Sequence, residues 1–301
     1  MPSRPRVLIA ITAAVVAGSL AMTGCSSSKK TASTASTGTT SSQNSAAAAL
    51  VPAAIKSKGS LTIATDASYP PDESFATDGH TIVGMDADLA VALSSALGLK
   101  ANLVNAKFDS IIPRLQSGTY DVGLSSFTDT KDREKTVDFV TYFQAGEGFY
   151  VKAGSSKTFN GLDSLCGAKV SVENGTTEQT DAQTQDKACK SAGKPGVTVQ
   201  SFADQNGANL AVSSGRADVG FADSQVAGYI VSQSNGQFQV SGTAFAVSPY
   251  GIALPKGNGM APAMLAAVKQ IIADGTYTKI LTKWGVQDGA VTNPVINGAT
   301  S

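Results

Sequence analysis

A polar stretch at residues 125–135, SSFTDTKDREK, holds the side chain with the clearest chemical role, Arg133. A strand-like run at residues 121–124 leads into it, and Thr130 is of the type that caps a helix, which we expect to start at the next residue. Because a helix N-terminus already carries partial positive charge and unpaired N–H groups, a cation there indicates an anionic ligand. The alternative is a solvated arginine balanced by the acidic residues on either side of it.

A second segment of the chain echoes the first. Residues 116–126, QSGTYDVGLSS, and residues 213–224, SSGRADVGFADS, share a helix end at glycine, a strand entered through aspartate and a polar loop after the strand. In the alternative, Gly-x-x-Asp-Val is only a common sequence where a helix is followed by a strand. If the two segments occupy equivalent positions in two similar lobes, one loop presents Arg133 with hydroxyls and the other presents Asp223. These groups match the two charges of a zwitterion.

The elements around these loops have the pattern of an α/β protein. Residues 61–65, LTIAT, are typical of a buried strand, and in residues 86–98 the residues Leu89, Leu93, Ala96 and Leu97 share one helix face that ends at Gly98. Strand and helix patterns then alternate to the C-terminus, which predicts largely parallel sheets with ligands at the carboxyl ends of the strands.

Composition limits the partners. The chain has 301 residues, 42% of them hydrophobic and 15% charged, which is enough for a large core in two domains or lobes. Its formal net charge is zero and its basic residues are scattered. We therefore expect no nucleic-acid partner.

The N-terminus has the features of an export signal. Arg4 and Arg6 precede an uncharged run and the sequence MTGC, which is similar to a lipobox and makes Cys25 the candidate for lipidation after removal of residues 1–24. Residues 25–57 are expected to form a Ser/Thr/Ala-rich tether. We expect a lipid-anchored protein on the extracytoplasmic face of the cell membrane; an uncleaved N-terminal anchor and simple secretion are the alternatives.

The remaining cysteines, Cys166 and Cys189, form an even pair, and in an oxidising compartment a disulfide is expected. A catalytic thiol would need a base, and the one histidine, His80, lies in a glycine-containing turn. Two cysteines and one histidine also make a poor metal site. We expect no metal and no cofactor.

Residues 59–297 resemble family 3 of the solute-binding proteins, the polar amino-acid receptors of ABC importers. The resemblance implies two α/β lobes of the type II periplasmic-binding-protein fold, with crossover strands near residues 149–153 and 247–254. It divides the chain into lobe 1 at 58–150, lobe 2 at 151–246 and a return to lobe 1 at 247–297, with a tail to 301. It further implies a monomer that binds a free amino acid and meets permease subunits. The motifs that carry it are LTIATDASYPP, IVGMDADLAVALSSALG, FDSIIPRLQSGTYDVGLSSFTDTKDREKTVDFVTYF, KVSVENGTTEQ, SGRADVGFADSQVAGY and YGIALPKGN.

The resemblance also implies roles for individual residues. Arg133 matches the arginine that binds the α-carboxylate of the ligand, and Asp223 matches the carboxylate that takes the α-ammonium group. Considered alone, Asp223 could instead cap a helix. The other matching positions are Ser126, Thr128 and Thr177 as hydrogen-bond donors and Tyr69 and Phe108 as side-chain walls, and Glu173 lies at a variable, pocket-facing position. Phe108 alone could equally be a core residue.

Charge indicates the kind of ligand. Asp66, Asp72, Glu73 and Glu173 are expected near the side-chain end of the pocket, so a cationic or neutral polar amino acid is favoured. Asp72 also departs from the Pro-Phe that the family most often has at this point. In the alternative, Asp66 and Glu173 bind neighbouring backbone while Asp72 and Glu73 point into solvent.

Two other functional classes remain open. Related proteins of this fold include an arogenate and prephenate dehydratase, and a carboxylate pair such as Glu173 and Asp223 could do acid/base work. The same clamp could also act on a signalling partner through another chain. We expect a receptor and not an enzyme.

Overall fold

The computed structural model describes residues 46–300, which belong to one compact unit. The expected signal peptide, the lipidation site Cys25 and most of the expected tether lie outside the described residues.

An eight-stranded mixed sheet runs through both lobes, in the order β5-β1-β6-β11-β7-β10-β8-β9. Strands that alternate with helices pair in parallel, as expected, whereas β7 and β11 run antiparallel to each other and to their outer neighbours. The strands are β1 Ser60–Thr65, β5 Lys100–Asn105, β6 Val122–Gly123, β7 Val137–Lys152, β8 Lys169–Glu173, β9 Thr198–Phe202, β10 Val219–Asp223 and β11 Phe238–Pro255. A small second sheet joins β2 Ser68–Tyr69, β3 Glu73–Phe75 and β4 Ile82–Val83.

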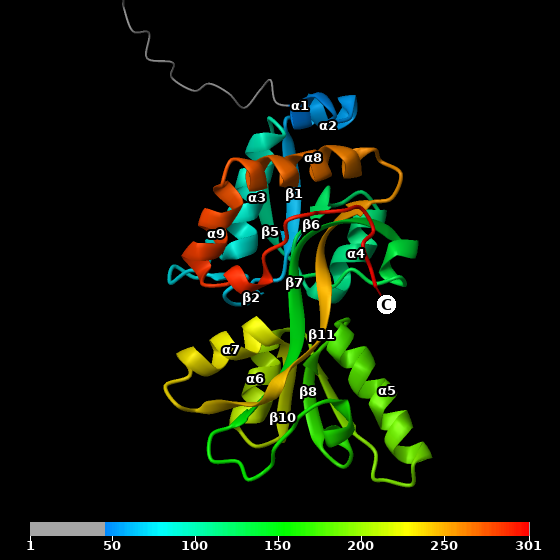
Figure 1. Ribbon diagram of the computed structural model, residues 1–301, viewed down its shortest axis with the longest axis vertical. Coiled ribbons are helices and arrows are strands. Elements are labelled where there is room, and N and C mark those ends of the chain that lie inside the picture. The colour runs from blue at the N-terminus through cyan, green and yellow to red at the C-terminus, as the bar shows by residue number, and fades with distance from the viewer. Residues whose placement is uncertain (1–45, 301) are drawn as a thin grey trace, which may run out of the picture. The chain divides into compact units, whose positions relative to one another are not determined.

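Strands β7 and β11 connect the two lobes (Figure 1). They pair from Phe238 with Lys152 to Pro255 with Val137, with register shifts where they pass between the lobes. Both strands are much longer than the segments 149–153 and 247–254 expected as crossovers. The two α/β lobes joined by two crossover strands confirm the expected fold class.

Lobe 1 holds β1 to β6 with its helices, which are α1 Ala46–Ala49, α2 Ala53–Lys58, α3 Met85–Ala96, α4 Phe108–Gln116, α8 Met260–Ala273 and α9 Thr276–Trp284. Lobe 2 holds β8 to β10 with α5 Thr177–Ser191, α6 Gln205–Ser213 and α7 Ser224–Gln233. Three short 3-10 helices complete the fold, η1 Arg133–Lys135, η2 Leu162–Leu165 and η3 Gln287–Gly289. The apolar face predicted for α3 is buried at Leu89, Leu93, Ala96 and Leu97, and Gly98 follows with a positive φ of 70°.

The repeated Gly-x-x-Asp-Val segment has a structural cause. Each copy follows a helix, α4 or α6, and enters the strand of its lobe that lies beside the crossover pair, β6 or β10. Asp121 accepts a hydrogen bond from the backbone N–H of Thr62 in β1 at 2.7 Å, and Asp218 accepts one from the N–H of Lys169 in β8 at 2.9 Å. In each lobe the aspartate therefore ties the incoming strand to its parallel neighbour, and the polar loop opens at the other end of that strand.

The N-terminal part of lobe 1 differs from the expectation. Residues 46–57, expected as part of the tether, belong to α1, α2 and the turn between them, and Ala47, Ala48 and Val51 are buried. Small alanine side chains allow α1 to lie close against α8. The expected tether therefore extends too far.

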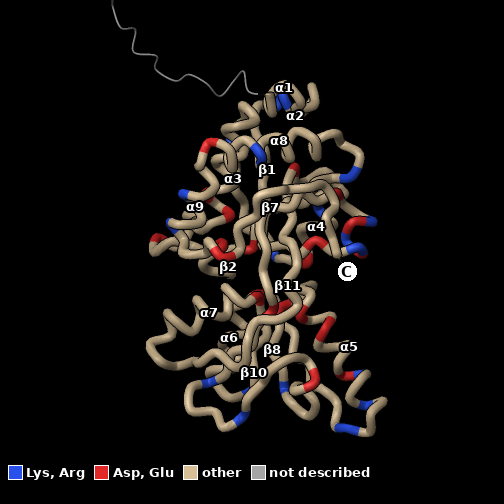
Figure 2. The backbone as a smooth tube through the Cα atoms, viewed as in Figure 1, with Lys and Arg blue, Asp and Glu red and all other residues tan. Residues whose placement is uncertain are grey.

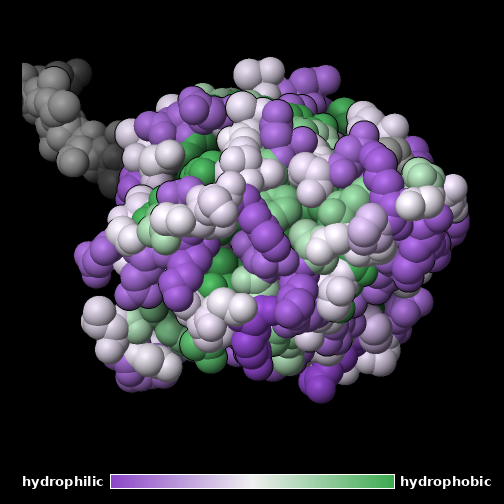
Figure 3. Space-filling view, turned by 90° about the horizontal axis from the view of Figure 1, so that it is seen from below, coloured by the Kyte–Doolittle hydropathy of each residue, from purple (hydrophilic) through white to green (hydrophobic). Residues whose placement is uncertain are grey.

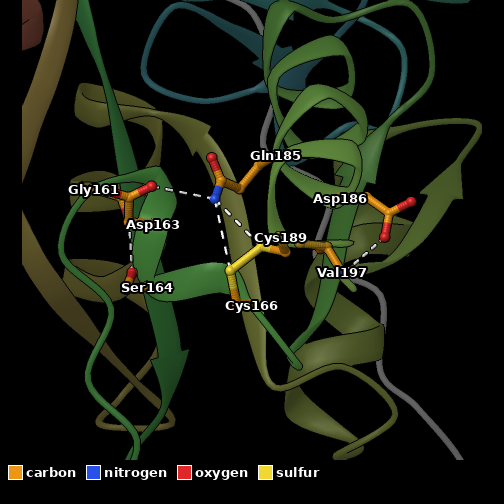
Figure 4. Close-up of a disulfide and its surroundings, with 8 residues drawn as sticks. All are labelled: Gly161, Asp163, Ser164, Cys166, Gln185, Asp186, Cys189 and Val197. Carbon is orange, nitrogen blue, oxygen red and sulfur yellow. Dashed lines mark hydrogen bonds between the residues drawn. A yellow bond between two sulfur atoms is a disulfide. The ribbon is translucent and has the colours of Figure 1, made fainter. Parts of the chain in front are cut away.

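The disulfide between Cys166 and Cys189 is confirmed, and it ties η2 to α5 in lobe 2. Gln185, one helical turn before Cys189, lies beside both sulfur atoms and Asp163 (Figure 4). The bridge lies within the lobe 2 core.

Seen from below, the outer end of lobe 2 is largely hydrophilic with small hydrophobic areas (Figure 3).

Candidate ligand-binding site

The helix expected after Thr130 is a single 3-10 turn, η1. The prediction of an α-helix there was wrong, because the chain enters β7 at Val137 and leaves no room for further turns. The N-cap residue of this turn is Asp132 and not Thr130, although the hydroxyl of Thr130 accepts a hydrogen bond from the N–H of Arg133 at 3.2 Å.

The guanidinium of Arg133 lies between the lobes. Nη1 donates to the carbonyl of Thr128 in lobe 1 at 2.8 Å, and Nη2 donates to the carbonyl of Gly175 in lobe 2 at 2.9 Å. The guanidinium also lies over the rings of Phe108 and Phe127, at 5.4 and 5.5 Å from their centroids. Burial lowers the pKa of Arg133.

The acidic neighbours of Arg133 do not balance its charge. Glu134 forms an ion pair with Lys131, and Asp132 forms one with Lys135. Arg133 instead contacts two neutral carbonyl oxygens. The alternative of a solvated, locally balanced arginine therefore does not hold.

The wall of lobe 2 opposite Arg133 is the start of α5. Thr176 caps this helix by accepting a hydrogen bond from the N–H of Gln179, and the hydroxyls of Thr177 and Thr128 lie 3.4 Å apart across the lobes. A Cβ on Gly175 would lie 2.9 Å from the Cβ of Asp109 in lobe 1, so only glycine allows the lobes to approach this closely here.

Two carboxyl groups of lobe 2 face the charge of Arg133. Asp223 is the last residue of β10 and occupies the N-cap position of α7, as the alternative expected, but its side chain makes no capping hydrogen bond. Burial and the nearby charge of Glu178 raise the pKa of Asp223 well above its ordinary value, while the charge of Arg133 opposes this shift. Sequence reasoning missed Glu178, although the acidic residue in the first turn of a helix was a visible signal.

Aromatic side chains form the adjoining wall. Tyr69 meets Phe108 edge to face, at 5.8 Å between centroids, and Phe108 stacks on Phe127 at 4.4 Å. Phe108 is buried within an apolar cluster and also lines the space beside Arg133. Phe108 is therefore a core residue, as the alternative expected, and it also borders the space in which a ligand wall would lie.

Asp66 and Glu173 lie behind Tyr69. Asp66 accepts a hydrogen bond from the N–H of Phe108 at 3.1 Å. Burial, followed by the charge of Asp66, raises the pKa of Glu173 to about 9. Glu173 in lobe 2 is therefore an uncharged acid at neutral pH beside a carboxyl of lobe 1.

Asp72 and Glu73 are fully buried, so the alternative in which they point into solvent was wrong. The hydroxyl of Ser126 donates to Asp72 at 3.0 Å and to Glu73 at 3.3 Å, and the amide of Gln225 in lobe 2 donates to Asp72 at 2.8 Å. These two carboxyls hold the Ser126 loop and are not among the residues that line the spaces beside Arg133.

Two adjoining spaces border Arg133. The narrower one is lined by seven of the nine expected ligand residues, which are Tyr69, Phe108, Ser126, Thr128, Arg133, Thr177 and Asp223. Thr176 and Glu178 also line it, and sequence reasoning missed both. The larger one, of about 640 Å³, shares Thr128, Arg133, Thr176, Thr177 and Asp223 with it. Asp66 and Glu173 line neither space. Together the two spaces form the candidate site.

Residues 61–287 match the family model of bacterial extracellular solute-binding proteins, family 3. The chain belongs to this family. It is 30% identical to the arginine-binding protein ArgT of Corynebacterium glutamicum over 98% of this chain and 97% of ArgT. It also resembles the solved structure of an ancestral arginine-binding protein bound to arginine, with 38% identity, a TM-score of 0.69 and coverage of 75% of this chain and 98% of that one.

A further family relative is the solved ancestral amino acid-binding protein AncCDT-1, a precursor of cyclohexadienyl dehydratase. It is 33% identical with a TM-score of 0.69, over 77% of this chain and 97% of that one. This solute-binding protein therefore captures an amino acid for an ABC importer, and its relatives are mostly binding proteins. Within residues 46–300, every helix is too short or too polar to cross a membrane.

The buried acid Glu173 predicts a pH dependence of stability. The pKa of Glu173 in the folded state, about 9, is above the ordinary value of 4.5. The folded state therefore holds a proton that the unfolded state loses within the pH window between these two values. Stability should therefore fall as pH rises through it, and Glu173→Gln should reduce the drop in unfolding temperature between about pH 5.5 and about pH 8.5. Differential scanning calorimetry checks this, with the exposed Asp132→Asn as control. An unchanged drop in Glu173→Gln would show that Glu173 is charged in the folded protein.

Proposed function

We propose that this solute-binding protein captures a cationic amino acid, foremost arginine, between its lobes. The observation that carries the proposal is the guanidinium of Arg133 facing the carboxyls of Asp223 and Glu178 across the cleft. A cation and an anion on facing walls match the α-carboxylate and α-ammonium groups of an amino acid.

In this proposal Arg133 binds the α-carboxylate. A carboxylate forms stronger, charge-assisted hydrogen bonds to a guanidinium than the carbonyls of Thr128 and Gly175 can form. Thr177, the first residue of α5, adds a hydroxyl and the positive end of the helix. Asp223 takes the α-ammonium group.

The rest of the ligand lies against Tyr69 and Phe108, which supply apolar area for methylene groups. Asp66 and Glu173 lie behind this wall and line neither of the two spaces that border Arg133. ArgT and the ancestral structure, both arginine-binding by name, support arginine as the first candidate.

Ligand capture requires a change in the contacts between the lobes. The bond from Arg133 to Gly175 and the contact between Thr128 and Thr177 already connect the two walls, and the narrower space is about 10 Å³. An amino acid is larger than this, so the lobes must part to admit it. Closure is then favoured to the extent that the ligand binds the closed state better.

The second part of the proposal is that the protein binds its ligand and does not convert it chemically. The raised pKa values of Glu173 and Asp223 would suit acid/base catalysis, which is the competing function. AncCDT-1 is named both as an amino acid-binding protein and as a precursor of a dehydratase, so the same fold accommodates either role. We infer that the ligand leaves unchanged, as a receptor requires.

We also propose that the protein is a monomer held at the outer face of the cell membrane by a lipid on Cys25. In the full chain, Cys25→Ser should move the protein from the membrane fraction to the soluble fraction, as detected by immunoblotting of separated fractions. Equal membrane retention of both forms would favour an uncleaved N-terminal anchor.

Removing the guanidinium tests the clamp. Arg133→Ala should weaken binding of L-arginine by about 2–5 kcal/mol, because the α-carboxylate loses its charged partner inside a closed cleft. Isothermal titration calorimetry measures this, with Arg216→Ala as the matched control, since its guanidinium lies over Phe202 in lobe 2. Wild-type affinity in a folded Arg133→Ala protein would contradict the assignment.

A panel of amino acids tests ligand choice. Arginine should raise the unfolding temperature most, since a tight ligand stabilises the folded state by mass action, with lysine, histidine or glutamine next. Glutamate and aspartate should give the smallest shifts, because a second carboxylate meets the acidic wall. A largest shift from either acidic ligand would overturn the cationic preference.

A further inference from the structure

A carboxyl group on a crossover strand faces the same cleft from the side of the hinge. Glu147 lies on β7 where the strand passes between the lobes, and its register partner in β10 is Asp223. Directly opposite residues of an antiparallel pair point to the same face of the sheet. Glu147 and the proposed α-ammonium partner are therefore neighbours.

Glu147 is buried without a full set of partners. Glu147 is 6% exposed, and its Oε2 atom contacts no hydrogen-bond donor among the described residues. It also lines the larger space of about 640 Å³. Burial, followed by the charges of Glu178 and Asp181, raises its pKa to about 10. A carboxyl in this setting is costly unless a positive group pairs with it.

Asp181 completes the acidic wall. It lies one turn along α5 from Thr177, lines the same space and has its pKa raised by burial. Figure 2 shows acidic segments gathered where β7, β11 and the start of α5 meet.

The basic residues on the facing wall are already engaged. Lys131 pairs with Glu134, Lys135 pairs with Asp132, and Arg133 donates to backbone carbonyls. Within residues 46–300, no cluster of three potential metal ligands is present. An organic cation fits this wall, because its several N–H groups can each donate to a carboxyl oxygen.

We propose that Glu147 and Asp181 form a second cation subsite, beside the α-ammonium position, for an ammonium or guanidinium group that the ligand carries in addition to its α-nitrogen. This inference rests on the proposed function, because the clamp at Arg133 and Asp223 orients the ligand toward it. The cationic group can come from the side chain of a basic amino acid or from the N-terminus of a dipeptide.

Two ligand pairs distinguish these sources, since each pair differs by one cationic group. L-arginine against L-citrulline tests the side chain, and glycyl-L-glutamine against N-acetyl-L-glutamine tests the N-terminus. Calorimetry is done on the wild-type protein, Glu147→Gln, Asp181→Asn and the control Asp132→Asn, which removes an exposed charge from the rim of the same space. Glu173→Gln serves as a comparison for the pocket behind Tyr69.

We expect the cationic member of at least one pair to bind the wild-type protein about tenfold or more tightly, as a charged hydrogen bond implies. Glu147→Gln and Asp181→Asn should each reduce this ratio at least about threefold while Asp132→Asn leaves it unchanged. Binding of the cationic member should also release protons, seen as a dependence of the heat on buffer ionisation, and less so in Glu147→Gln.

The inference is overturned if both ratios in Glu147→Gln and Asp181→Asn equal the wild-type ratios, or if only Glu173→Gln lowers them. It is also overturned if neither pair shows a cationic advantage in the wild-type protein. Failure of the proposed function is a separate outcome, in which the wild-type protein binds neither arginine nor any other amino acid of the panel.

Discussion

The imbalance of charge between the two lobes is the constraint on which the site depends. Asp223, Glu178, Glu147 and Asp181 surround a cleft in which Arg133 is the cation that opposes them. Burial raises the pKa values of all four carboxyls, which favours their protonated, uncharged forms. In the function proposed above, a cationic ligand supplies the positive charge that pairs with these carboxyls.

The fold brings these groups together through two long strands. β7 carries Glu147, and β10 ends with Asp223 beside it, while β11 pairs with β7 on the other side. The two lobes repeat one arrangement, in which Asp121 or Asp218 ties a strand to its neighbour and a polar loop follows. Each loop therefore reaches the cleft from its own lobe, one with Arg133 and one with Asp223.

Much of this could be predicted from the sequence, because local patterns determine it. The alternation of strands and helices, the buried face of α3 and the disulfide depend on spacing and residue type, and motif positions placed Arg133, Thr177 and Asp223 on facing walls. The α-helix expected at Thr130 was wrong because β7 begins too soon after it. Asp72 and Glu73 could not be placed, since their burial depends on serine and glutamine donors more than 50 residues away in the sequence. Glu147 was missed because it pairs with β10 only in the folded sheet.

The most direct test of the central claim is a crystal structure of the wild-type protein with L-arginine. The account predicts the α-carboxylate of the ligand on the guanidinium of Arg133, in place of the carbonyl of Gly175, and the α-ammonium group on Asp223. A ligand carboxylate bound elsewhere, with Arg133 still donating to Gly175, would contradict it.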